Sequence, residues 1–372
     1  MRENKASRVL VRKASQDLRN TVEEIITTFS GNTFAGATVL IKPNMVGPSS
    51  PDLGHTTHPE LVQAVVQACL DRNAKVWVGD NPGGMQSNSR NVAQKTGILE
   101  AAGGCFLPIS ERVVEKTGHD TGFALVISRT VLEADYVINL PVFKTHAGMM
   151  ITGAIKNTYG YVAGACKARL HVQARSNVNF AKAVCDVFQT RPPDLHIIDG
   201  ITAIEGNGPC HGGQQRKLDR LLAGTDPLAV DAVMARMMGV DPAILPVQKE
   251  ALVRGIGVLD ESRIDVDGDF FKIPDFKMPS AFLTTTLDEE SLEKLRKLYP
   301  PNMMATRTEV KPVRDADKCV NCGDCEANCP PKALTLEPDF HINDDCIACY
   351  CCVELCPEGA MEVPDVEAYR HY

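Results

Sequence analysis

One arrangement of cysteines constrains this chain more than any other feature of its sequence. Nine of the fourteen cysteines lie after residue 318, where two runs repeat one spacing. The runs are Cys319-x2-Cys322-x2-Cys325-x3-Cys329-Pro330 and Cys346-x2-Cys349-x2-Cys352-x3-Cys356-Pro357. In such a run, three thiolates of a short loop bind three iron corners of one [4Fe-4S] cluster, and the fourth cysteine ligates the other cluster. The spacing therefore predicts two [4Fe-4S] clusters in a small α+β domain of the bacterial ferredoxin type.

The same rule assigns the ligands. One cluster is predicted to bind Cys319, Cys322, Cys325 and Cys356, and the other to bind Cys346, Cys349, Cys352 and Cys329. A zinc site normally closes with four ligands from paired CxxC or histidine elements, and disulfides are rare in a reducing cytoplasm. Cys351 is a surplus cysteine beside a ligand. We interpret it as a partly buried small side chain, with a regulatory or ligand-exchanging thiol as the alternative.

The length of the chain indicates two domains, because single hydrophobic cores usually stop growing near about 250 to 300 residues. We predict an α/β domain over residues 1–300, a linker over 301–314 and the ferredoxin-like domain over 315–372. The N-terminus lacks the apolar core of a signal peptide, and no apolar run approaches the roughly 18 residues of a membrane helix. We therefore expect a cytoplasmic protein without a membrane span.

Charge is distributed unevenly along the chain. Residues 315–372 contain thirteen Asp and Glu residues and three Lys and Arg residues, a balance of −10, whereas the whole chain carries −8. An acidic cysteine-rich domain suits docking to a basic patch on a redox partner protein. It argues against binding to nucleic acid.

Residues 7–300 alternate between β-rich apolar runs and stretches of helical period. This pattern predicts an α/β fold with a mainly parallel sheet and helices on both faces. Five apolar runs end in a polar segment punctuated by glycine or proline, namely residues 37–41, 75–79, 135–139, 194–198 and 218–223. The carboxyl ends of parallel strands meet at one edge of a sheet, where ligands bind. We therefore expect the five polar segments to converge on one crevice.

Helix start signals occur between these runs. Thr57 is the predicted N-cap of one helix, with Glu60 returning to it as in a capping box. Asp226 is placed to cap another helix, with a proline at its first position. A third helix is predicted over residues 287–298, where acidic residues precede basic ones.

Lys144 and His146 are the strongest candidates for a catalytic pair. They follow a strand end that contains Pro141. A cation beside a titratable imidazole suits an anionic substrate that needs a proton.

The other candidate binding residues belong to the same set of strand-end and glycine-flanked segments. They are Lys42, Asn44, His58, Asp80, Lys156, Asn157, Glu205 and Asp226. The stretch from 199 to 213 is rich in glycine, which indicates a close backbone approach to a ligand. Structural alternatives stay open: Lys42 and Asp80 also fit turns, His58 fits a solvent-facing position, and Asp226 fits a helix cap.

Other cofactors are less well supported. His58, His146, His211, Asp80, Asp226 and Glu205 are acceptable metal ligands, but their scattered spacing is not a metal motif. The chain has no GxGxxG after a strand, no Walker A sequence and no nucleophile elbow. Nicotinamide, nucleotide triphosphatase and hydrolase functions therefore lack support. Many flavin sites have no short motif, so a bound flavin stays compatible with the sequence.

Seven segments occur in a distinctive order: KPN, THPE, GDNPGG, PVFKTH, GAIKNTYG, DGITAIEGNGP and AGTDPLAVDAV. In these segments the chain resembles the family called domain of unknown function 362 (DUF362), which is often fused to a two-cluster ferredoxin module. The likeness covers about residues 35–240. The resemblance implies an iron-sulfur α/β protein of a kind common in anaerobes, and it supports grouping the candidate residues in one site. It names no substrate.

Two hypotheses about function follow. In the first, the chain is an iron-sulfur oxidoreductase in which an external donor reduces the clusters and electrons pass to a small anionic ligand. Lys144 and Lys156 would hold this anion, and His146 would supply a proton. In the second, the chain is a non-enzymatic electron-transfer, docking or cofactor-assembly subunit. An enzyme needs ionisable side chains that converge on a pocket, whereas a docking module would present an exposed apolar patch.

Overall fold

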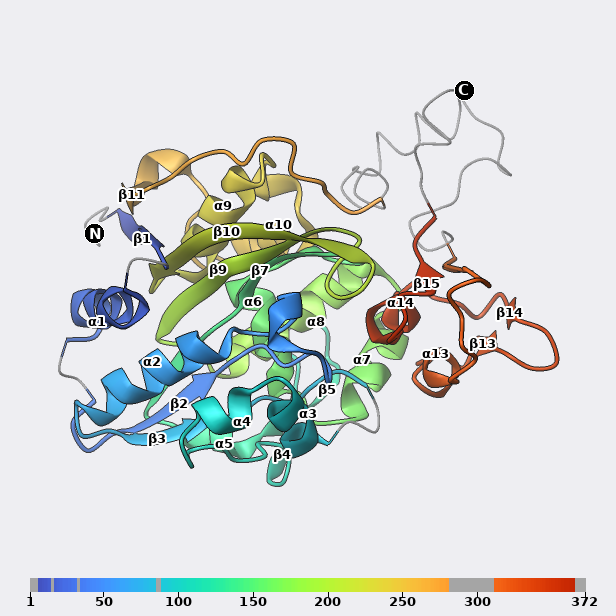
Figure 1. The fold of residues 1–372 in the computed structure, drawn as a ribbon, viewed down its shortest axis with the longest axis horizontal. Coiled ribbons are helices and arrows are strands. Elements are labelled where there is room, and N and C mark those ends of the chain that lie inside the picture. Colours follow the sequence, from blue (N-terminus) through green and yellow to red (C-terminus); the bar gives the residue numbers. More distant parts are fainter. Residues whose placement is uncertain (1–5, 15–16, 32–33, 85–87, 281–310, 365–372) are drawn as a thin grey trace.

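The structure is a computed structural model that describes residues 6–14, 17–31, 34–84, 88–280 and 311–364. Two parts are visible in Figure 1. Residues 6–280 form an α/β region around a central sheet, and residues 311–364 form a cysteine-rich region beside it. Buried side chains of both regions belong to one hydrophobic cluster, so the two regions pack directly against each other.

One mixed sheet organises the α/β region. Within the described residues its strand order is β11-β1-β10-β9-β6-β2-β3, and β7 pairs with both β8 and β9. The strands are β1 (Ser7–Lys13), β2 (Thr38–Lys42), β3 (Lys75–Val78), β6 (Tyr136–Asn139), β7 (Val142–His146), β8 (Met150–Thr152), β9 (Leu195–Gly206), β10 (Gly213–Gly224) and β11 (Ile264–Gly268). β2, β3, β6 and β9 run parallel to one another, whereas β10 is antiparallel to both of its neighbours. The predicted α/β fold with a mainly parallel sheet is confirmed.

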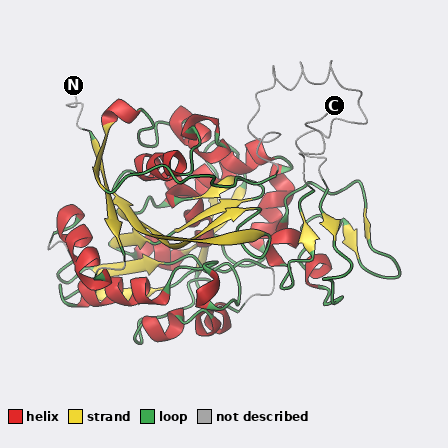
Figure 2. Ribbon diagram, turned by 45° about the horizontal axis from the view of Figure 1, so that its top comes forward, coloured by secondary structure: helices red, strands yellow, loops and turns green. Residues whose placement is uncertain are grey.

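Helices cover both faces of this sheet (Figure 2), and the apolar pattern of the strands explains why. In β2, Val39 and Ile41 pack in one hydrophobic cluster, while Leu40 between them packs in another. In β10, Leu221 and Leu222 divide between two clusters in the same way. Successive side chains of a strand point to opposite faces, so strands that are apolar at every position are buried on both sides.

The helices alternate with the strands, as predicted. They are α1 (Leu18–Phe29), α2 (Pro59–Leu70), α3 (Ser89–Lys95), α4 (Ile98–Ala101), α5 (Arg129–Glu133), α6 (Ala154–Asn157), α7 (Cys166–Ala174), α8 (Asn177–Thr190), α9 (Pro227–Met237) and α10 (Pro246–Val253). A separate hairpin is formed by β4 (Val113–Thr117) and β5 (Ala124–Ser128).

The predicted capping box at the start of α2 is wrong by one residue. The N-cap is His58, whose Nδ1 accepts a hydrogen bond from the Glu60 amide at 3.3 Å. The Thr57 hydroxyl instead donates to the Leu140 carbonyl at 2.7 Å. The Thr57 hydroxyl therefore connects the segments that follow β2 and β6, and the neighbouring His58 is the N-cap.

The glycine-rich stretch also differs from the prediction. β9 does not end at residue 198 but continues to Gly206, and a short connection leads into β10, so this stretch is largely a hairpin. Because β10 runs antiparallel to β9, it ends at the opposite edge of the sheet from β2, β3, β6 and β9. The fifth polar segment therefore does not reach the predicted crevice. Its Asp226 caps α9, accepting hydrogen bonds from the amides of Leu228 and Ala229, both at 3.0 Å.

The cysteine-rich region consists of short elements. They are β12 (Val313–Arg314), α13 (Asp324–Ala327), β13 (Leu334–Thr335), β14 (His341–Ile342), α14 (Cys351–Leu355) and β15 (Met361–Glu362). β12 pairs with β15, so residues 313–314 belong to this region and not to the predicted linker. The predicted helix over 287–298 and the linker residues up to 310 lie outside the described residues. Among the described helices there is no candidate for a transmembrane segment.

Candidate functional site

Two cavities lie within the cysteine-rich region, and each is lined by four predicted cluster ligands. One cavity, with about 320 Å³ of space including its opening, is lined by Cys319, Cys322, Cys325 and Cys356. The other, with about 330 Å³, is lined by Cys329, Cys346, Cys349 and Cys352. Each cavity thus receives three cysteines from one run and the fourth from the other. Four thiols around one space are the donor set that a [4Fe-4S] cluster requires.

The two cysteine runs share local geometry as well as spacing. In each run, the residue two positions after the first cysteine has a left-handed backbone, with φ values of 54° and 46°. The amide of Ala333 donates to Cys329 Sγ, and the amide of Ala360 donates to Cys356 Sγ, both at 3.2 Å. The fourth cysteine of each run thus accepts an equivalent N–H···S hydrogen bond. Such bonds to ligand sulfurs tune the reduction potential of a cluster.

A cleft with about 850 Å³ of space, part of it open to solvent, lies where the two regions meet. Its α/β wall comes from the segments after β2 and β3, from β7 and from α6 and α7. The predicted residues that line it are Asn44, Asp80, Lys144, His146, Lys156 and Asn157. The cysteine-rich region contributes Pro330, Cys351 and Glu354. The cleft therefore joins most of the predicted site to the neighbourhood of the cysteines.

Lys42 and Asp80 form a buried ion pair that supports this wall. The Lys42 side chain is fully buried, and its Nζ lies 2.8 Å from Asp80 Oδ1. Asp80 Oδ2 accepts a hydrogen bond from the Met45 amide at 2.8 Å. A Cβ atom at Gly160 would lie 1.9 Å from Asp80 Oδ1, which explains the glycine at that position. Lys42 is thus a paired lysine outside the cleft lining and not a free cation within it.

Lys144 belongs to a hydrogen-bonded network of asparagines. Its Nζ donates to Asn44 Oδ1 and to the His55 carbonyl, both at 2.6 Å. Asn44 Nδ2 donates to Asn157 Oδ1, and Asn157 Nδ2 donates to Asn139 Oδ1, both at 2.8 Å. An ammonium group has three N–H donors, so one is left for a ligand. Burial lowers the pKa of Lys144 to about 8.

His146 is held in one tautomer at the end of β7. Its Nδ1 accepts hydrogen bonds from the amides of Gly148 and Met149, both at 3.1 Å. Burial, assisted by the charge of Lys156, lowers the pKa of His146 well below its ordinary value. The ring is therefore neutral and carries its proton on Nε2. This Nε2 lies 3.8 Å from Glu354 Oε2 in α14, so the N–H is directed toward the cysteine-rich region.

Two further lysines line the cleft. Lys167 on α7 donates hydrogen bonds to the carbonyls of Asn81 and Pro82, and burial lowers its pKa to about 8. Lys156 on α6 has no hydrogen-bond or ion-pair partner in the described part of the chain. Burial lowers the pKa of Lys156, while the charge of Glu354 opposes the shift. The cleft lining thus has three lysines and two carboxylates, Asp80 and Glu354. This excess of positive groups favours an anionic ligand.

Three further predicted binding residues, besides Lys42, lie outside the cleft lining. His58 caps α2, Asp226 caps α9, and Glu205 in β9 forms an ion pair with Arg216 at 2.8 Å. In the residues that the structure describes, the histidines and carboxylates considered as crevice metal ligands, including His211, do not gather into a group. Helix capping and the reversed direction of β10 account for this dispersion.

Several residues of the cleft were missed by the sequence reasoning. Lys167 and His171 are four positions apart in α7, and this spacing was the available signal because it places two side chains on one helix face. Glu354 and Cys351 reach the cleft only because α14 packs against the α/β region. No local pattern could have linked them to His146.

Comparison with known families agrees with both parts of this description. Residues 39–236 match the family described as a domain of unknown function (DUF362), and this match spans more than half of the chain. The chain belongs to this family. Residues 311–357 match a 4Fe-4S dicluster domain, so the cysteine-rich region is an iron-sulfur domain of ferredoxin type. The resemblance to a DUF362 protein fused to a ferredoxin module is confirmed.

Individual relatives cover parts of this DUF362 protein. A thylakoid-associated protein of Synechocystis is 36% identical over 214 residues, which are 57% of this chain and 66% of that protein, just under two thirds of its length. An uncharacterized ferredoxin of Methanocaldococcus jannaschii is 37% identical over 49 residues, 12% of this chain and 79% of the ferredoxin. Among solved structures, the lactate racemase apoprotein from Thermoanaerobacterium thermosaccharolyticum has a TM-score of 0.40 at 11% identity, over 61% of this chain and 56% of that chain.

Proposed function

We propose that this protein is an oxidoreductase that passes electrons from two [4Fe-4S] clusters to a small anion bound in the cleft. The observation that best supports this proposal is that the cleft shares a wall with the cavity lined by Cys329 and Cys352. Pro330 and Cys351 line the cleft, and each is the sequence neighbour of a cysteine that lines this cavity. A cluster held there is adjacent to any ligand in the cleft.

The lysines of the cleft provide the anion-binding groups. Lys156 offers an ammonium that has no partner among the described residues, and Lys144 offers its remaining N–H donor; both act as point charges on a carboxylate or phosphate. We propose that neutral His146 acts as a hydrogen-bond donor through Nε2 and not as the proton donor, because a neutral imidazole is a poor acid. Lys144, with a pKa of about 8, is closer to the ideal for a proton donor near neutral pH.

The other cavity is suited to electron entry. Among its four cysteines, Cys322 is exposed, and the nearby residue Val320 is 63% exposed. The surrounding region carries an excess of Asp and Glu residues, which complements a basic patch on an electron donor. We propose that a partner protein docks there in the cytoplasm and reduces this cluster first.

Anaerobic purification tests the proposal. Iron, sulfide and flavin would be quantified, and small molecules released by denaturation would be identified by mass spectrometry. We expect about eight irons and an organic anion. Lys156→Met should lose the anion and retain the iron, whereas Lys249→Met, at an exposed position of α10, should retain both.

The contrary result is equally specific. If the protein contains about eight irons but no small molecule, and carboxylates and inorganic phosphate leave the electron paramagnetic resonance spectrum of its reduced clusters unchanged, it is not an enzyme of this kind. A non-enzymatic electron-transfer subunit would then be the better description.

A further inference from the structure

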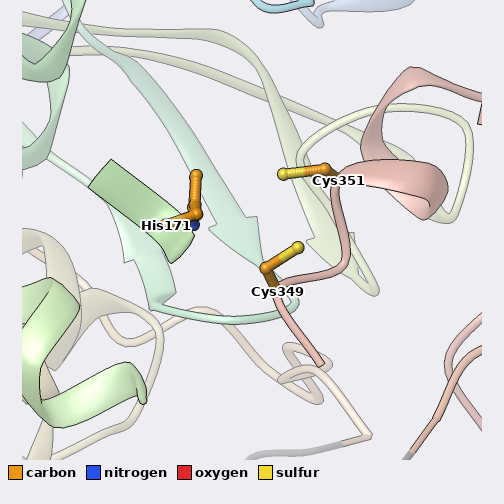
Figure 3. A group of neighbouring side chains, drawn as sticks. All are labelled: His171, Cys349 and Cys351. Atoms are coloured by element: carbon orange, nitrogen blue, oxygen red, sulfur yellow. The ribbon is translucent and has the colours of Figure 1, made fainter. Parts of the chain in front are cut away.

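Three potential metal ligands meet on the wall between the cleft and the second cysteine cavity. Cys349 Sγ, Cys351 Sγ and a ring nitrogen of His171 lie within 4.8 Å of one another. Figure 3 shows the three side chains next to one another, with the sulfur of Cys351 directed toward His171 of α7. No other three His, Cys, Asp or Glu side chains gather as closely in the described part of the chain.

The two cysteines are lining residues of different cavities. Cys349 lines the cavity of the predicted cluster, whereas Cys351 and His171 line the cleft. The side chains of Cys349 and Cys351 are hydrogen-bonded to each other. The spacing rule for the clusters does not use Cys351. A thiolate has more than one lone pair, so Cys349 can bind a cluster iron and a second metal ion at the same time.

His171 is held in position by aromatic contacts. Its ring stacks on Phe180 with 4.0 Å between centroids and an angle of 18° between planes, and Tyr159 meets it edge-on at 5.9 Å. The ring has no side-chain hydrogen bond within the described residues. A fixed ring loses little conformational freedom when it binds a ligand, which favours binding.

We propose that Cys349, Cys351 and His171 bind one thiophilic transition-metal ion, of the class Fe²⁺, Ni²⁺ or Zn²⁺. Two thiolates and one imidazole are donors that such ions prefer. The ion shares the Cys349 thiolate with the cluster, so the proposal rests on the cluster ligation in the proposed function. Structural zinc sites close with four protein ligands, whereas catalytic metal sites keep a position for an external ligand.

The position of the site indicates what completes its coordination. His171 and Cys351 line the cleft together with Lys156, whose ammonium is unpaired among the described residues. The fourth coordination position therefore opens toward the anion-binding groups. A small anion bound there would contact the metal on one side and lysine on the other.

Cobalt provides a direct test, because Co²⁺ accepts the same donors and oxidised [4Fe-4S] clusters are diamagnetic. One equivalent of Co²⁺ would be added anaerobically to the full-length protein after its iron content has been measured. We expect a high-spin Co²⁺ resonance, and cobalt-edge X-ray absorption with sulfur at about 2.3 Å and nitrogen at about 2.0 Å. Cys351→Ala and His171→Phe should each weaken Co²⁺ binding at least tenfold without loss of iron. His171→Phe retains an aromatic ring against Phe180.

Matched controls are Cys105→Ala and His119→Phe, which alter a cysteine and a histidine of the α/β region outside the cleft lining. Both should bind Co²⁺ as the unaltered protein does.

The proposal is overturned if Co²⁺ binds without sulfur neighbours, if it does not bind to protein with full iron content, or if Cys351→Ala and His171→Phe bind it normally. Loss of about four irons in Cys351→Ala would also overturn it, because Cys351 would then ligate the cluster itself. A negative cobalt result leaves the anion test with Lys156→Met unaffected, so the two proposals fail separately.

Discussion

The buried pair of Lys42 and Asp80 gives the most quantitative test of the cleft. Asp80→Asn removes the charge that faces Lys42 but keeps a side-chain oxygen for the Met45 amide. Removing one partner of a buried ion pair costs about 3 to 5 kcal/mol, and the retained hydrogen bond places the expectation near the lower value. For a domain of about 250 residues or more, about 3 kcal/mol corresponds to a melting-temperature decrease of about 6 °C.

The dependence on pH has a defined sign. Burial lowers the pKa of Lys42 from 10.5 in the native state, and Asp80 opposes this shift. At pH values between the lowered native pKa of Lys42 and its ordinary value of 10.5, the unfolded chain therefore binds more protons than the native protein. The free energy of unfolding rises with pH in that window. Without Asp80 the native pKa falls further. The stability deficit of Asp80→Asn should therefore shrink as the pH rises toward 10.5.

The assay is anaerobic differential scanning calorimetry, with iron content measured to verify that the clusters are intact. Lys42→Met combined with Asp80→Asn should recover much of the loss, because it removes the unpaired buried charge. Glu133→Gln, which breaks an exposed pair with Arg112, serves as control and should change stability by less than about 1 kcal/mol. A melting temperature of Asp80→Asn within about 1 °C of the unaltered protein, or a double variant as unstable as the sum of both singles, would refute the reasoning.

Three further predictions concern the clusters, the cleft and its glycine. Cys322→Ser and Cys349→Ser should each lower the iron content from about eight to about four; full iron in both variants would contradict the ligand assignment. Because the pKa of Lys144 is about 8, binding of acetate, whose charge is constant near that value, should weaken as the pH rises through it, and an affinity measured by calorimetry that does not change between about pH 7 and 9 would exclude this role. Gly160→Ala places a Cβ 1.9 Å from Asp80 Oδ1 and should destabilise the protein by about 1 to 3 kcal/mol in thermal unfolding. Gly47→Ala, with no atom within 4 Å of its Cβ, should be tolerated, and equal losses in both variants would contradict the steric argument.

Much of the fold could be predicted because the relevant signals are local. The five apolar runs all became strands, since β-rich residues that are buried on both faces have few other solutions. The polar segments after β2 and β3, and within β7, meet at one edge as expected. The direction of β10 could not be read from its residues, because antiparallel pairing depends on the hairpin with β9. For this reason Asp226 lies at the opposite edge of the sheet.

The candidate site, too, could be predicted only in part from the sequence. The cysteine spacing by itself grouped Cys356 with the first run and Cys329 with the second, because the reach of a short loop around a cluster is a local property. Lys144, His146 and Lys156 could also be nominated locally. Only the tertiary structure placed Glu354, Cys351 and His171 around the same cleft, because these contacts arise from packing of the cysteine-rich region against α7, between segments far apart in the chain.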